Sequence, residues 1–536
     1  MDYLSGGGLA TARISDLAMS PPQNGTMLCA PLVAESVEEM LHQIKAAKAS
    51  GADVVELRVD YINSFQPGVD LPRLIEGRVL PVIITYRPNW EGGLYEGDEA
   101  ARVAALSLAI ELQADFIDVE LQVAEDFIAS QSSKRSSSST RIIVSNHNYH
   151  TTPSSEEIGR LVARMQATGA DIIKFVTTAN NVVDSANVFR VLAHTQLSLK
   201  VPTIALVMGQ KGLISRLLSP KFGGFLTFGT LSSGKESAPG QPTLTDLVRT
   251  YRLREMDCDT RVYGIIGNPV GHSKGPYLHN PAFEAIGYNA VYLPFLVDNL
   301  AEFLSVYSAP DFGGFSVTIP FKEDALKCCD EVESSAKAIG AVNTIIRRAD
   351  GKFVGYNTDC EAAISAIEDG VRESGYHGSQ PLSGKLCVVI GAGGAGKALA
   401  FGAKHRGARV VIANRNFERA KVLAESVGAE AISLETLSSF QPETGMILAN
   451  STSVGMQPNV QDTPIPKAAL KGYSVVFDAV YTPLETRLLR EAKESGAVVV
   501  SGLEMFIRQA IGQFELFTGQ PAPKSVMREI VAKMAP

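Results

Sequence analysis

The chain is poor in several patterns that mark common classes of protein. Its six cysteines, among 536 residues, form no C-x-x-C pair and no spacing typical of metal ligands, so the sequence predicts free thiols and no metal site. No apolar run approaches the roughly 20 residues of a membrane-spanning helix. Basic residues, 49 against 57 acidic ones, leave a net charge of -8, which argues against nucleic acid as the main ligand. We expect small molecules as partners and a monomeric chain.

The first residues match a transit peptide poorly, because such peptides are rich in arginine and poor in acidic residues. Residues 1–26 contain Asp2, Asp16 and a single arginine. We expect a short disordered lead there, and the sequence leaves a cytoplasmic location open.

Length and periodicity predict several α/β domains. A chain of 536 residues exceeds what one hydrophobic core supports. Over residues 27–257, eight short apolar segments alternate with amphipathic stretches, one of which begins with a predicted capping box of Ser36 and Glu39 and ends at Gly51. Eight such units predict a (β/α)8 barrel. The expected strands read MLCAPLV, VVELRVD, PVIITYR, FIDVEL, RIIVSNH, DIIKFVTT, PTIALVMG and FLTFGT.

Polar residues near the ends of these strands indicate a first site. The C-terminal strand ends of such a barrel meet at one face, so residues far apart in the sequence converge there. Three arginines, Arg58, Arg87 and Arg216, offer forked donors for a carboxylate or for polar ring substituents. The polar residues late in the strands are Glu56, Arg58, Arg87, Glu120, His147 and Lys174.

Lys174 and His147 suggest a chemistry for this site. A lysine attacks a ketone only as the neutral amine, and the apolar sequence neighbours of Lys174 favour that form. The resulting imine withdraws electrons, so His147, titrating near neutrality, is a natural base for the adjacent carbon, with Glu120 orienting its imidazole. Structural interpretations stay open: a barrel ion pair for the lysine and arginines, and a surface or satisfied core histidine for His147.

The second half of the chain predicts a different organisation. The barrel pattern ends near residue 258, and residues 258–365 read as a mixed α/β substrate-binding domain. Residues 366–502 open with a strand, a glycine loop, a helix and a second strand, which is typical of a doubly wound Rossmann domain. We expect the helical stretch 503–536 to pack back on the middle domain.

The glycine loop GAGGAG predicts a dinucleotide site, because backbone N–H groups at a helix start bind a pyrophosphate. An NAD enzyme usually presents an acidic residue to the ribose about twenty residues further on. This chain has Asn414, Arg415 and Arg419 instead, which favours the 2'-phosphate of NADP, although NAD is not excluded and an exposed basic turn is the structural alternative. The loop itself supplies Gly391, Gly393, Gly394, Ala395 and Gly396.

A lysine and an aspartate in the middle domain form a second catalytic candidate. Lys322 lies in FKEDAL and Asp359 in GYNTDC. Such a pair can move a proton to or from an alcohol oxygen while a hydride moves at the carbon. A structural ion pair is the alternative interpretation.

These motifs together resemble two enzymes joined in one chain. ELRVD, TYR, DVEL, SNHNYH, DIIKF, GLISRLLSPKFGGFLTFG and SAPGQ resemble, in order, type I 3-dehydroquinate dehydratase. FSVTIPFKEDAL, IGAVNTI, GYNTDC, NSTSVGM, FDAVYTPLET and LEMFIRQA resemble shikimate dehydrogenase. A dehydratase barrel followed by a dehydrogenase is the arrangement of the plant bifunctional shikimate-pathway family, and the resemblance covers nearly everything after residue 26.

The resemblance implies roles for individual residues. It implies an imine at Lys174, with His147 as general acid and base and Glu120 as its partner, in the loss of water from 3-dehydroquinate. It implies Lys322 and Asp359 as the catalytic pair of an NADP-dependent dehydrogenase, and a plastid location. The implied substrate contacts are Glu56, Arg58, Arg87, Arg216, Ser237 and Gln241 in the first site, and Ser273, Thr318, Asn343, Tyr481 and Gln509 in the second.

Two positions depart from the family pattern. The threonine that usually follows the Asn-Arg pair is Asn416, which weakens the indication for NADP. The usual Ser-Lys-Ser-Pro becomes Ser-Lys-Gly-Pro at Gly275, which removes a hydroxyl donor and frees space. A lost hydrogen bond to a charged group costs roughly 1.5–3 kcal/mol.

Gly275 bears on the choice of substrate. Shikimate carries its carboxylate on a trigonal ring carbon, whereas quinate has a tetrahedral carbon with an added hydroxyl there. We expect a lean towards quinate and 3-dehydroquinate, while retained Ser273 and Thr318 leave an ordinary shikimate preference open. A non-catalytic member that binds metabolites and regulates a partner would predict loss of catalytic residues, and none is lost.

Overall fold

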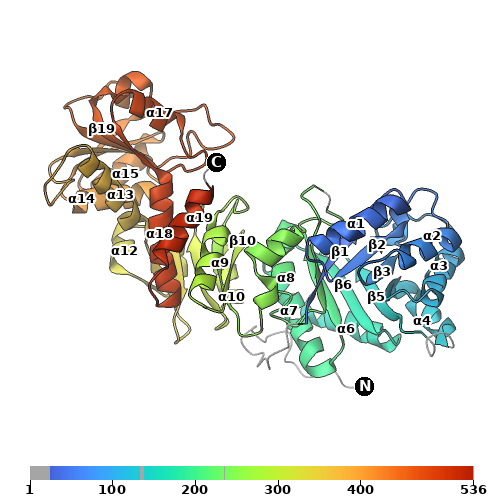
Figure 1. The fold of residues 1–536 in the computed structure, drawn as a ribbon. Helices are drawn as coiled ribbons and strands as arrows, with labels where there is room; N and C mark the ends of the chain where they lie inside the picture. The colour runs from blue at the N-terminus through green and yellow to red at the C-terminus, as the bar shows by residue number, and fades with distance from the viewer. Residues whose placement is uncertain (1–24, 133–137, 235, 535–536) are drawn as a thin grey trace. The chain divides into compact units, whose positions relative to one another are not determined.

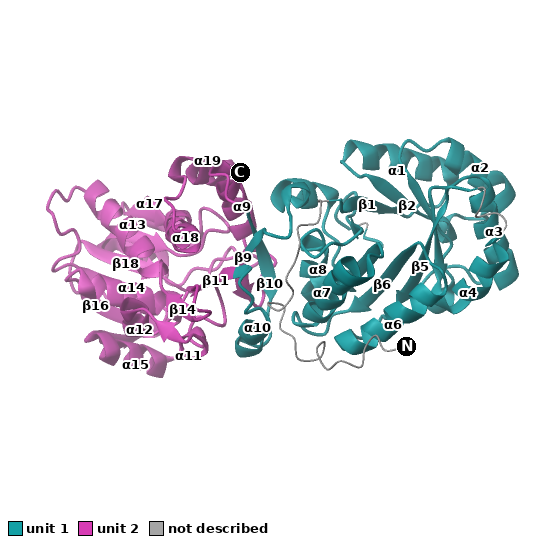
Figure 2. Cartoon of the chain, turned by 90° about the horizontal axis from the view of Figure 1, so that it is seen from below, with its two compact units in different colours: residues 1–262, 289–312 teal, residues 263–288, 313–536 magenta. Residues whose placement is uncertain are grey.

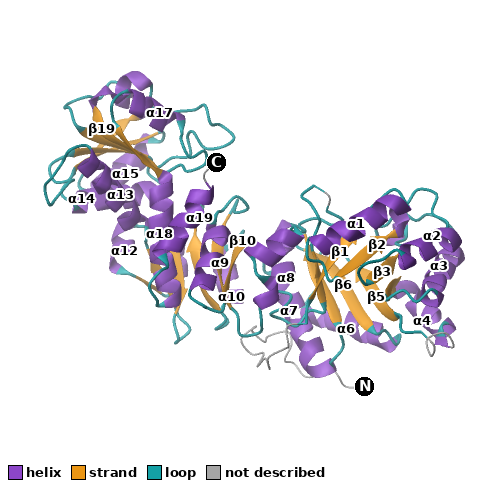
Figure 3. Ribbon diagram, in the orientation of Figure 1, coloured by secondary structure: helices purple, strands orange, loops and turns teal. Residues whose placement is uncertain are grey.

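The computed structural model describes residues 25–132, 138–234 and 236–534, so the lead expected over residues 1–26 lies almost wholly outside the described residues. The chain divides into two compact units, residues 1–262 with 289–312 and residues 263–288 with 313–536 (Figure 2). Strands and helices alternate along both units (Figure 3). No helix in the described part of the chain is long and apolar enough to cross a membrane.

Eight parallel strands form the nearly closed barrel that the sequence predicts (Figure 1). Hydrogen-bonded neighbours follow the order β7-β6-β5-β4-β3-β2-β1-β8, and at the seam the Phe225 N–H donates to the Thr203 carbonyl. The strands are β1 Met27–Leu32, β2 Val54–Arg58, β3 Val82–Thr85, β4 Phe116–Glu120, β5 Arg141–His147, β6 Ile172–Thr178, β7 Thr203–Met208 and β8 Leu226–Phe228.

Strand periodicity directs Lys174 into the barrel. Side chains two residues apart in a strand share a face, so Ile172, Lys174 and Val176 point the same way. Ile172 and Val176 belong to the buried interior cluster, together with Leu206 on the neighbouring strand. An ammonium group is therefore carried into an apolar interior, where it needs a partner of opposite charge.

The first barrel helix begins where the sequence predicts. In the first helix, Ser36 accepts a hydrogen bond from the Glu39 N–H. The reciprocal half of the predicted capping box is wrong, because the Glu39 carboxylate accepts from the Glu35 N–H instead of that of Ser36. The barrel helices are α1 Val37–Ala49, α2 Pro67–Glu76, α3 Glu99–Glu111, α4 Leu121–Ser130, α6 Ser155–Ala167, α7 Asp184–His194 and α8 Leu213–Leu217.

The middle of the chain forms a mixed sheet of six strands in the order β10-β9-β11-β13-β14-β12. Strand β13 pairs antiparallel with β11 and β14, whereas β12 and β14 are parallel. The strands are β9 Arg261–Gly267, β10 Ala290–Leu296, β11 Phe312–Val317, β12 Glu331–Val332, β13 Thr344–Arg347 and β14 Phe353–Tyr356. The helices are α9 Gly275–Ala285, α10 Leu300–Val306, α11 Ala325–Cys328, α12 Ser334–Ile339 and α13 Asp359–Glu373.

The third sheet is the doubly wound sheet that the glycine loop predicts. Its six strands are parallel, in the order β17-β16-β15-β18-β19-β20. The chain order reverses between β15 and β18, which is where ligands bind in sheets of this kind. The elements are β15 Leu386–Ile390, α14 Gly394–His405, β16 Arg409–Asn414, α15 Phe417–Val427, β17 Glu430–Ser433, α16 Leu434–Leu437, β18 Met446–Asn450, β19 Tyr473–Asp478, α17 Arg487–Glu494 and β20 Val498–Ser501.

The last two helices are α18 Gly502–Thr518 and α19 Lys524–Met534. Helix α18 packs on β13 and α13, and both helices contact α9. Gln513 bonds to Ser316 at 2.8 Å and to the Asn343 carbonyl at 3.2 Å, and its side chain is buried. The ring of Phe514 stacks on Phe283 of α9.

Two candidate active sites

The barrel interior brings several of the expected polar residues into one network. The Lys174 ammonium lies 2.9 Å from Glu56 Oε1 and 2.8 Å from Asp118 Oδ2. Arg87 donates to Asp118 at 2.8 Å and to Glu120 at 2.6 Å. All five residues are at most 5% exposed. With Arg102, which lies 2.7 Å from Glu120, three cations balance three carboxylates where water is scarce.

The sequence expectation about the charge of Lys174 is wrong. Burial alone would lower the pKa of Lys174, but Asp118 and Glu56 outweigh it and raise the pKa above its usual value. Burial would likewise raise the pKa of Asp118, yet Arg87 and Lys174 hold it well below its usual range. The amine is thus protonated in this structure and must lose a proton before it can attack a carbonyl.

The partner of His147 is Glu91, which the sequence analysis did not single out. His147 Nδ1 lies 2.9 Å from Glu91 Oε1, and the His147 backbone N–H donates to the same oxygen at 3.0 Å. Burial, helped by Arg87 and Lys174, holds the pKa of His147 well below its usual value, so the expected titration near neutrality is also wrong. Burial raises the pKa of Glu91 to about 7.

Glu120 does not orient His147, contrary to expectation. Its carboxylate lies 2.6 Å from Arg87 and 2.7 Å from Arg102, an arginine of α3 with no exposed surface. These two guanidinium groups occupy the carboxylate at the end of β4, so it is not available to the imidazole. Asp118 was also not among the expected site residues. Its position could have been predicted, because it lies two residues before Glu120 and therefore on the same face of β4.

The three arginines expected to bind substrate differ in their partners. Arg58 donates to both carboxylate oxygens of Asp60, from Nε at 2.9 Å and from Nη2 at 2.6 Å. Arg87 is hydrogen-bonded within the interior network. Arg216, on α8, is 1% exposed, and its Nε and Nη1 have no hydrogen-bond partner among the described residues. Burial lowers the pKa of Arg216 to about 10. A buried guanidinium with open donors is suited to an anion.

Two further expected contacts of the first site lie close together. Gln241 donates from Nε2 to Ser237 Oγ at 3.1 Å, and its Oε1 accepts from the Ser237 backbone N–H at 3.1 Å. These bonds hold the two side chains of the segment as a pair.

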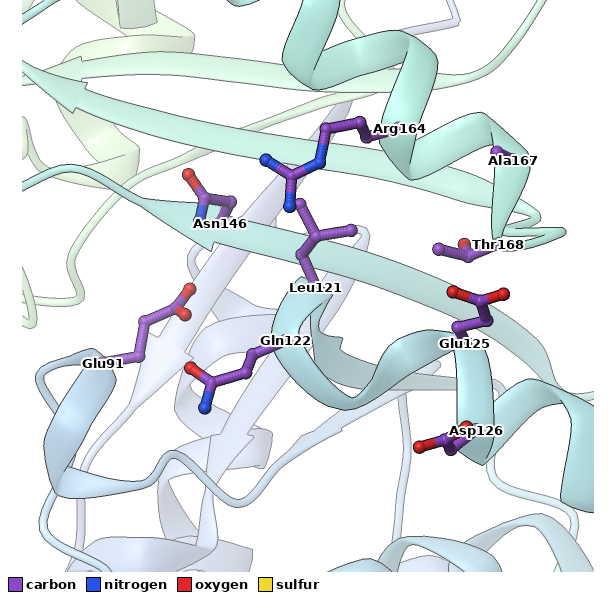
Figure 4. Close-up of a pocket in the computed structure, with 9 residues that line it drawn as sticks. All are labelled: Glu91, Leu121, Gln122, Glu125, Asp126, Asn146, Arg164, Ala167 and Thr168. Carbon is purple, nitrogen blue, oxygen red and sulfur yellow. The ribbon is translucent and has the colours of Figure 1, made fainter.

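A cavity of about 620 Å³ lies beside the first site, between α4 and α6 (Figure 4). Glu91 is the one lining residue that bonds to His147, so the cavity adjoins the site without containing the expected residues. Its walls are Glu91, Leu121, Gln122, Glu125, Asp126, Asn146, Arg164, Ala167 and Thr168.

In the second unit, the structure brings Lys322 and Asp359 together. Lys322 Nζ donates to Asp359 Oδ2 at 2.5 Å, and Asp359 is 3% exposed. Asp359 is the first residue of α13, where the helix dipole favours a negative charge. The Lys322 chain also lies against the glycine loop, because a Cβ at Gly394 would be 3.0 Å from Lys322 Cδ.

The expected substrate residues near this pair are partly tied to the protein. Asn343, buried, bonds to Thr358, the residue before Asp359, through both its Nδ2 (2.9 Å) and its Oδ1 (2.8 Å). The Thr318 methyl group lies against Gly267, where a Cβ would be 2.5 Å away. Tyr481 stacks on the Phe506 ring with centroids 4.9 Å apart, and Gln509 donates to the Phe506 carbonyl.

The altered serine position begins a helix. Gly275 is the first residue of α9, is buried, and donates its N–H to Ser273 Oγ at 3.1 Å. Ser273 Oγ therefore acts as an acceptor, and its hydroxyl hydrogen is left for another partner.

The glycine loop has the shape of a nucleotide cradle. Gly391 has φ +109°, and a Cβ there would lie 2.3 Å from Ser451 Oγ. A Cβ at Gly396 would lie 2.1 Å from the Gly391 carbonyl, whereas space is open around Gly393. Glycine is thus required where the loop packs, and the backbone N–H groups of Gly394 and Ala395 begin α14.

The basic residues beyond β16 have distinct surroundings. Asn414 donates to the Asn416 carbonyl at 2.8 Å, and Arg415 is exposed. Arg419 donates from Nη2 to Glu323 at 3.2 Å and to the Ala392 carbonyl of the glycine loop at 3.3 Å. Asn416 caps α15 by accepting from the Arg419 N–H, a role that a threonine also performs. The departure at this position therefore leaves the helix start intact.

Within the described ranges, no group of three or more histidine, cysteine, aspartate or glutamate side chains is placed to hold a metal ion.

The interior network makes a prediction about stability. Asp118→Asn removes a charge that balances Arg87 and Lys174, and breaking a buried pair costs about 3–5 kcal/mol. Urea unfolding followed by the fluorescence of Trp90, the single tryptophan, should show a loss of that size. The exposed carboxylate Asp126 provides a matched control, since Asp126→Asn should change stability by less than about 0.5 kcal/mol. Equal midpoints for the two variants would contradict the assigned role of the network.

Family models match both halves of the chain. Residues 28–258 match type I 3-dehydroquinase, and residues 265–345 match the shikimate dehydrogenase substrate binding domain. Residues 376–460 match shikimate / quinate 5-dehydrogenase, and residues 502–532 match the shikimate 5'-dehydrogenase C-terminal domain.

Individual relatives match about half of the chain or nearly all of it. A shikimate dehydrogenase (NADP(+)) of Bacillus mycoides is 39% identical over 51% of this chain and 98% of its own length. The solved dehydroquinate dehydratase and shikimate dehydrogenase from S. pombe is 27% identical, with coverage of 95% and 98% and a TM-score of 0.41. The bifunctional 3-dehydroquinate dehydratase/shikimate dehydrogenase, chloroplastic, of Arabidopsis thaliana is 58% identical over 95% of this chain and 85% of its own length. The chain therefore belongs to the family of bifunctional 3-dehydroquinate dehydratase/shikimate dehydrogenases.

Proposed function

We propose that the barrel dehydrates 3-dehydroquinate to 3-dehydroshikimate through an imine on Lys174. The observation that carries this proposal is the buried Lys174 ammonium, held between two carboxylates and electrostatically coupled to a neutral His147. Arg216, whose buried donors are open, would bind the substrate carboxylate. The other expected contacts would bind the ring substituents, although Arg58 and Arg87 must first share or release their carboxylate partners.

The residues present can carry each step. Lys174 loses a proton to the Glu56 carboxylate 2.9 Å away, and its amine attacks the ketone carbon; water leaves and the imine forms. Neutral His147, held through Nδ1 by Glu91, takes the proton of the adjacent carbon at Nε2. The electrons move towards the imine, and His147 returns the proton to the departing hydroxyl, which leaves as water. Hydrolysis of the imine frees Lys174, so the net change is loss of one water molecule.

Trapping tests the imine. Addition of 3-dehydroquinate followed by borohydride should leave a reduced adduct on Lys174, detected by peptide mass spectrometry. Lys221, buried and bonded to the Cys258 carbonyl, should stay unmodified in the same digest. Lys174→Met should abolish dehydratase activity and leave the dehydrogenase of the same chain intact. An adduct elsewhere, or dehydration by the variant, would refute the imine.

We further propose that the second site interconverts 3-dehydroshikimate and shikimate with NADP. When bound, the cofactor accepts or supplies the hydride. The glycine loop and the α14 N-terminus would hold the pyrophosphate, and Asn414, Arg415 and Arg419 would surround the 2'-phosphate. Lys322, in contact with Asp359, would exchange the proton of the substrate hydroxyl, and Asn343 would fix the residue before Asp359. Ser273, Thr318, Tyr481 and Gln509 would complete the substrate contacts.

Cofactor selectivity tests the role assigned to Arg419. Arg419→Gln removes a charge that only NADP would use, so kcat/KM with NADP should fall about tenfold or more while that with NAD changes little. Arg409 is a matched control, because it is 56% exposed, as against 55% for Arg419, and lies at the opposite end of β16. An equal loss with both cofactors, or none, would remove Arg419 from the phosphate site.

The substitution at Gly275 supports a finer proposal, a lean towards quinate and 3-dehydroquinate. Without a serine at the first position of α9, one hydroxyl donor is missing beside Ser273, and the volume that a serine side chain would fill is left for the extra hydroxyl of quinate. Retained Thr318 is the main argument for an ordinary shikimate preference.

The substrate preference is tested by restoring the serine. The purified protein should show a higher kcat/KM with quinate than with shikimate, measured through nicotinamide absorbance with NADP and with NAD. Gly275→Ser should shift the ratio towards shikimate by about one to two decades. Gly271→Ser adds the same hydroxyl where the surrounding space is open, and should change nothing. If shikimate is preferred and the serine merely improves it, the lean towards quinate is wrong.

We propose the domain limits 27–257, 258–365, 366–502 and 503–536, with the last segment packed on the substrate-binding domain. The bonds from Gln513 of α18 to Ser316 and to the Asn343 carbonyl, and the packing of α19 on α9, support the last point. A plastid location is proposed because a relative 58% identical is described as chloroplastic.

A further inference from the structure

Asp478 is a buried carboxylate that the proposed reaction does not use. It ends β19, has no exposed surface, and accepts three hydrogen bonds. The donors are Asn450 Nδ2 at 2.9 Å, Thr486 Oγ1 at 2.6 Å and the Val480 N–H at 3.1 Å. A buried carboxylate that collects three donors from three segments fixes their relative positions.

One of these bonds leads to the glycine loop. Asn450 ends β18, and its Oδ1 accepts from the Thr452 N–H at 3.0 Å and from the Thr452 hydroxyl at 2.7 Å. Between them, Ser451 donates to the Ile390 carbonyl at 2.7 Å, and its Oγ lies 2.3 Å from where a Cβ of Gly391 would be. Residues 450–452 therefore form the wall of the nucleotide cradle at the point where the strand order reverses.

A second bond leads to the segment that carries Tyr481. Asp478 fixes the N–H of Val480, the residue directly before Tyr481, whose ring stacks on Phe506. The Thr482 carbonyl accepts from the Gln457 N–H at 3.2 Å, so the segment is held on both sides of the tyrosine.

We propose that Asp478 is a positioning residue of the dehydrogenase, which sets the cofactor wall at residues 450–452 and the segment around Tyr481 from one buried carboxylate. This inference rests on the proposed dehydrogenase function. The third bond, to Thr486, anchors the start of α17 and leads to neither segment.

The protonation state of the Asp478 carboxylate makes its positioning role depend on pH. Burial raises the pKa of Asp478 to about 6, and the groups that face it are the neutral donors of Asn450, Thr486 and Val480. Above that pH the ionised group accepts all three bonds; below it, the protonated group is a weaker acceptor, so the bonds from Asn450 and Val480 weaken. Part of the dehydrogenase activity should therefore disappear as the pH falls through about 6.

The test compares variants of the full chain in the dehydrogenase reaction. Asp478→Ala and Asn450→Ala should each raise KM for NADPH about tenfold, with a smaller loss of kcat. Asp478→Asn keeps the volume and mimics the protonated group, so it should retain more activity and lack the acidic decline near pH 6. Dehydratase activity, measured in the same samples, should not change.

Thr486→Val is the structural control. It removes one bond to Asp478 on the α17 side, so it should lower thermal stability and leave KM for NADPH unchanged. The inference fails if Asp478→Ala leaves KM unchanged, or if Thr486→Val raises it equally. Titration of NADPH fluorescence measures binding without turnover. A wild-type chain that binds NADPH but reduces no substrate would thus contradict the proposed function alone.

Discussion

The barrel depends on a balance of charges that are almost wholly buried. Arg87 and Lys174 enter the interior only because Asp118, Glu56 and Glu120 meet them there, and a lone buried charge would cost several kcal/mol. This balance explains why Arg87 is committed within the protein, why Lys174 rests as an ammonium, and why His147 is neutral beside two cations. The reaction proposed for this site therefore depends on how Lys174, its carboxylate partners and His147 redistribute protons when a substrate with a ketone and a carboxylate binds.

In the second unit, backbone dipoles at helix N-termini supply part of the positive potential around the candidate site. Asp359 lies at the first turn of α13, and the glycine loop leads into the first turn of α14, so two helix N-termini supply positive potential near Lys322. Asp478 is satisfied by neutral donors alone. A site built on such dipoles needs fewer formal charges and tolerates a bound anion without rearranging a network of ion pairs.

The sequence predicted those parts of the structure that follow from periodicity. The eight barrel strands, the doubly wound sheet and the contact between Lys322 and Asp359 all rest on patterns that are local or carried by motifs. Asp118 could have been found from its spacing to Glu120, since both face the same side of one strand. Glu91 could not, because it lies in a short turn whose position relative to His147 depends on how loops fold over the barrel. The charge of Lys174 was mistaken because sequence neighbours in a strand are not its neighbours in space.

The bond between Arg419 and Glu323 has a consequence for the solution in which the protein works. Both side chains are about half exposed, so ions reach them freely, and at physiological ionic strength screening acts over about 8 Å. Added salt weakens the pull of Glu323 on the guanidinium and also the attraction of the guanidinium for a phosphate. With the role proposed for Arg419, discrimination between NADP and NAD depends on the ionic strength of the solution as well as on the chain, and the preference for NADP decreases as ionic strength rises.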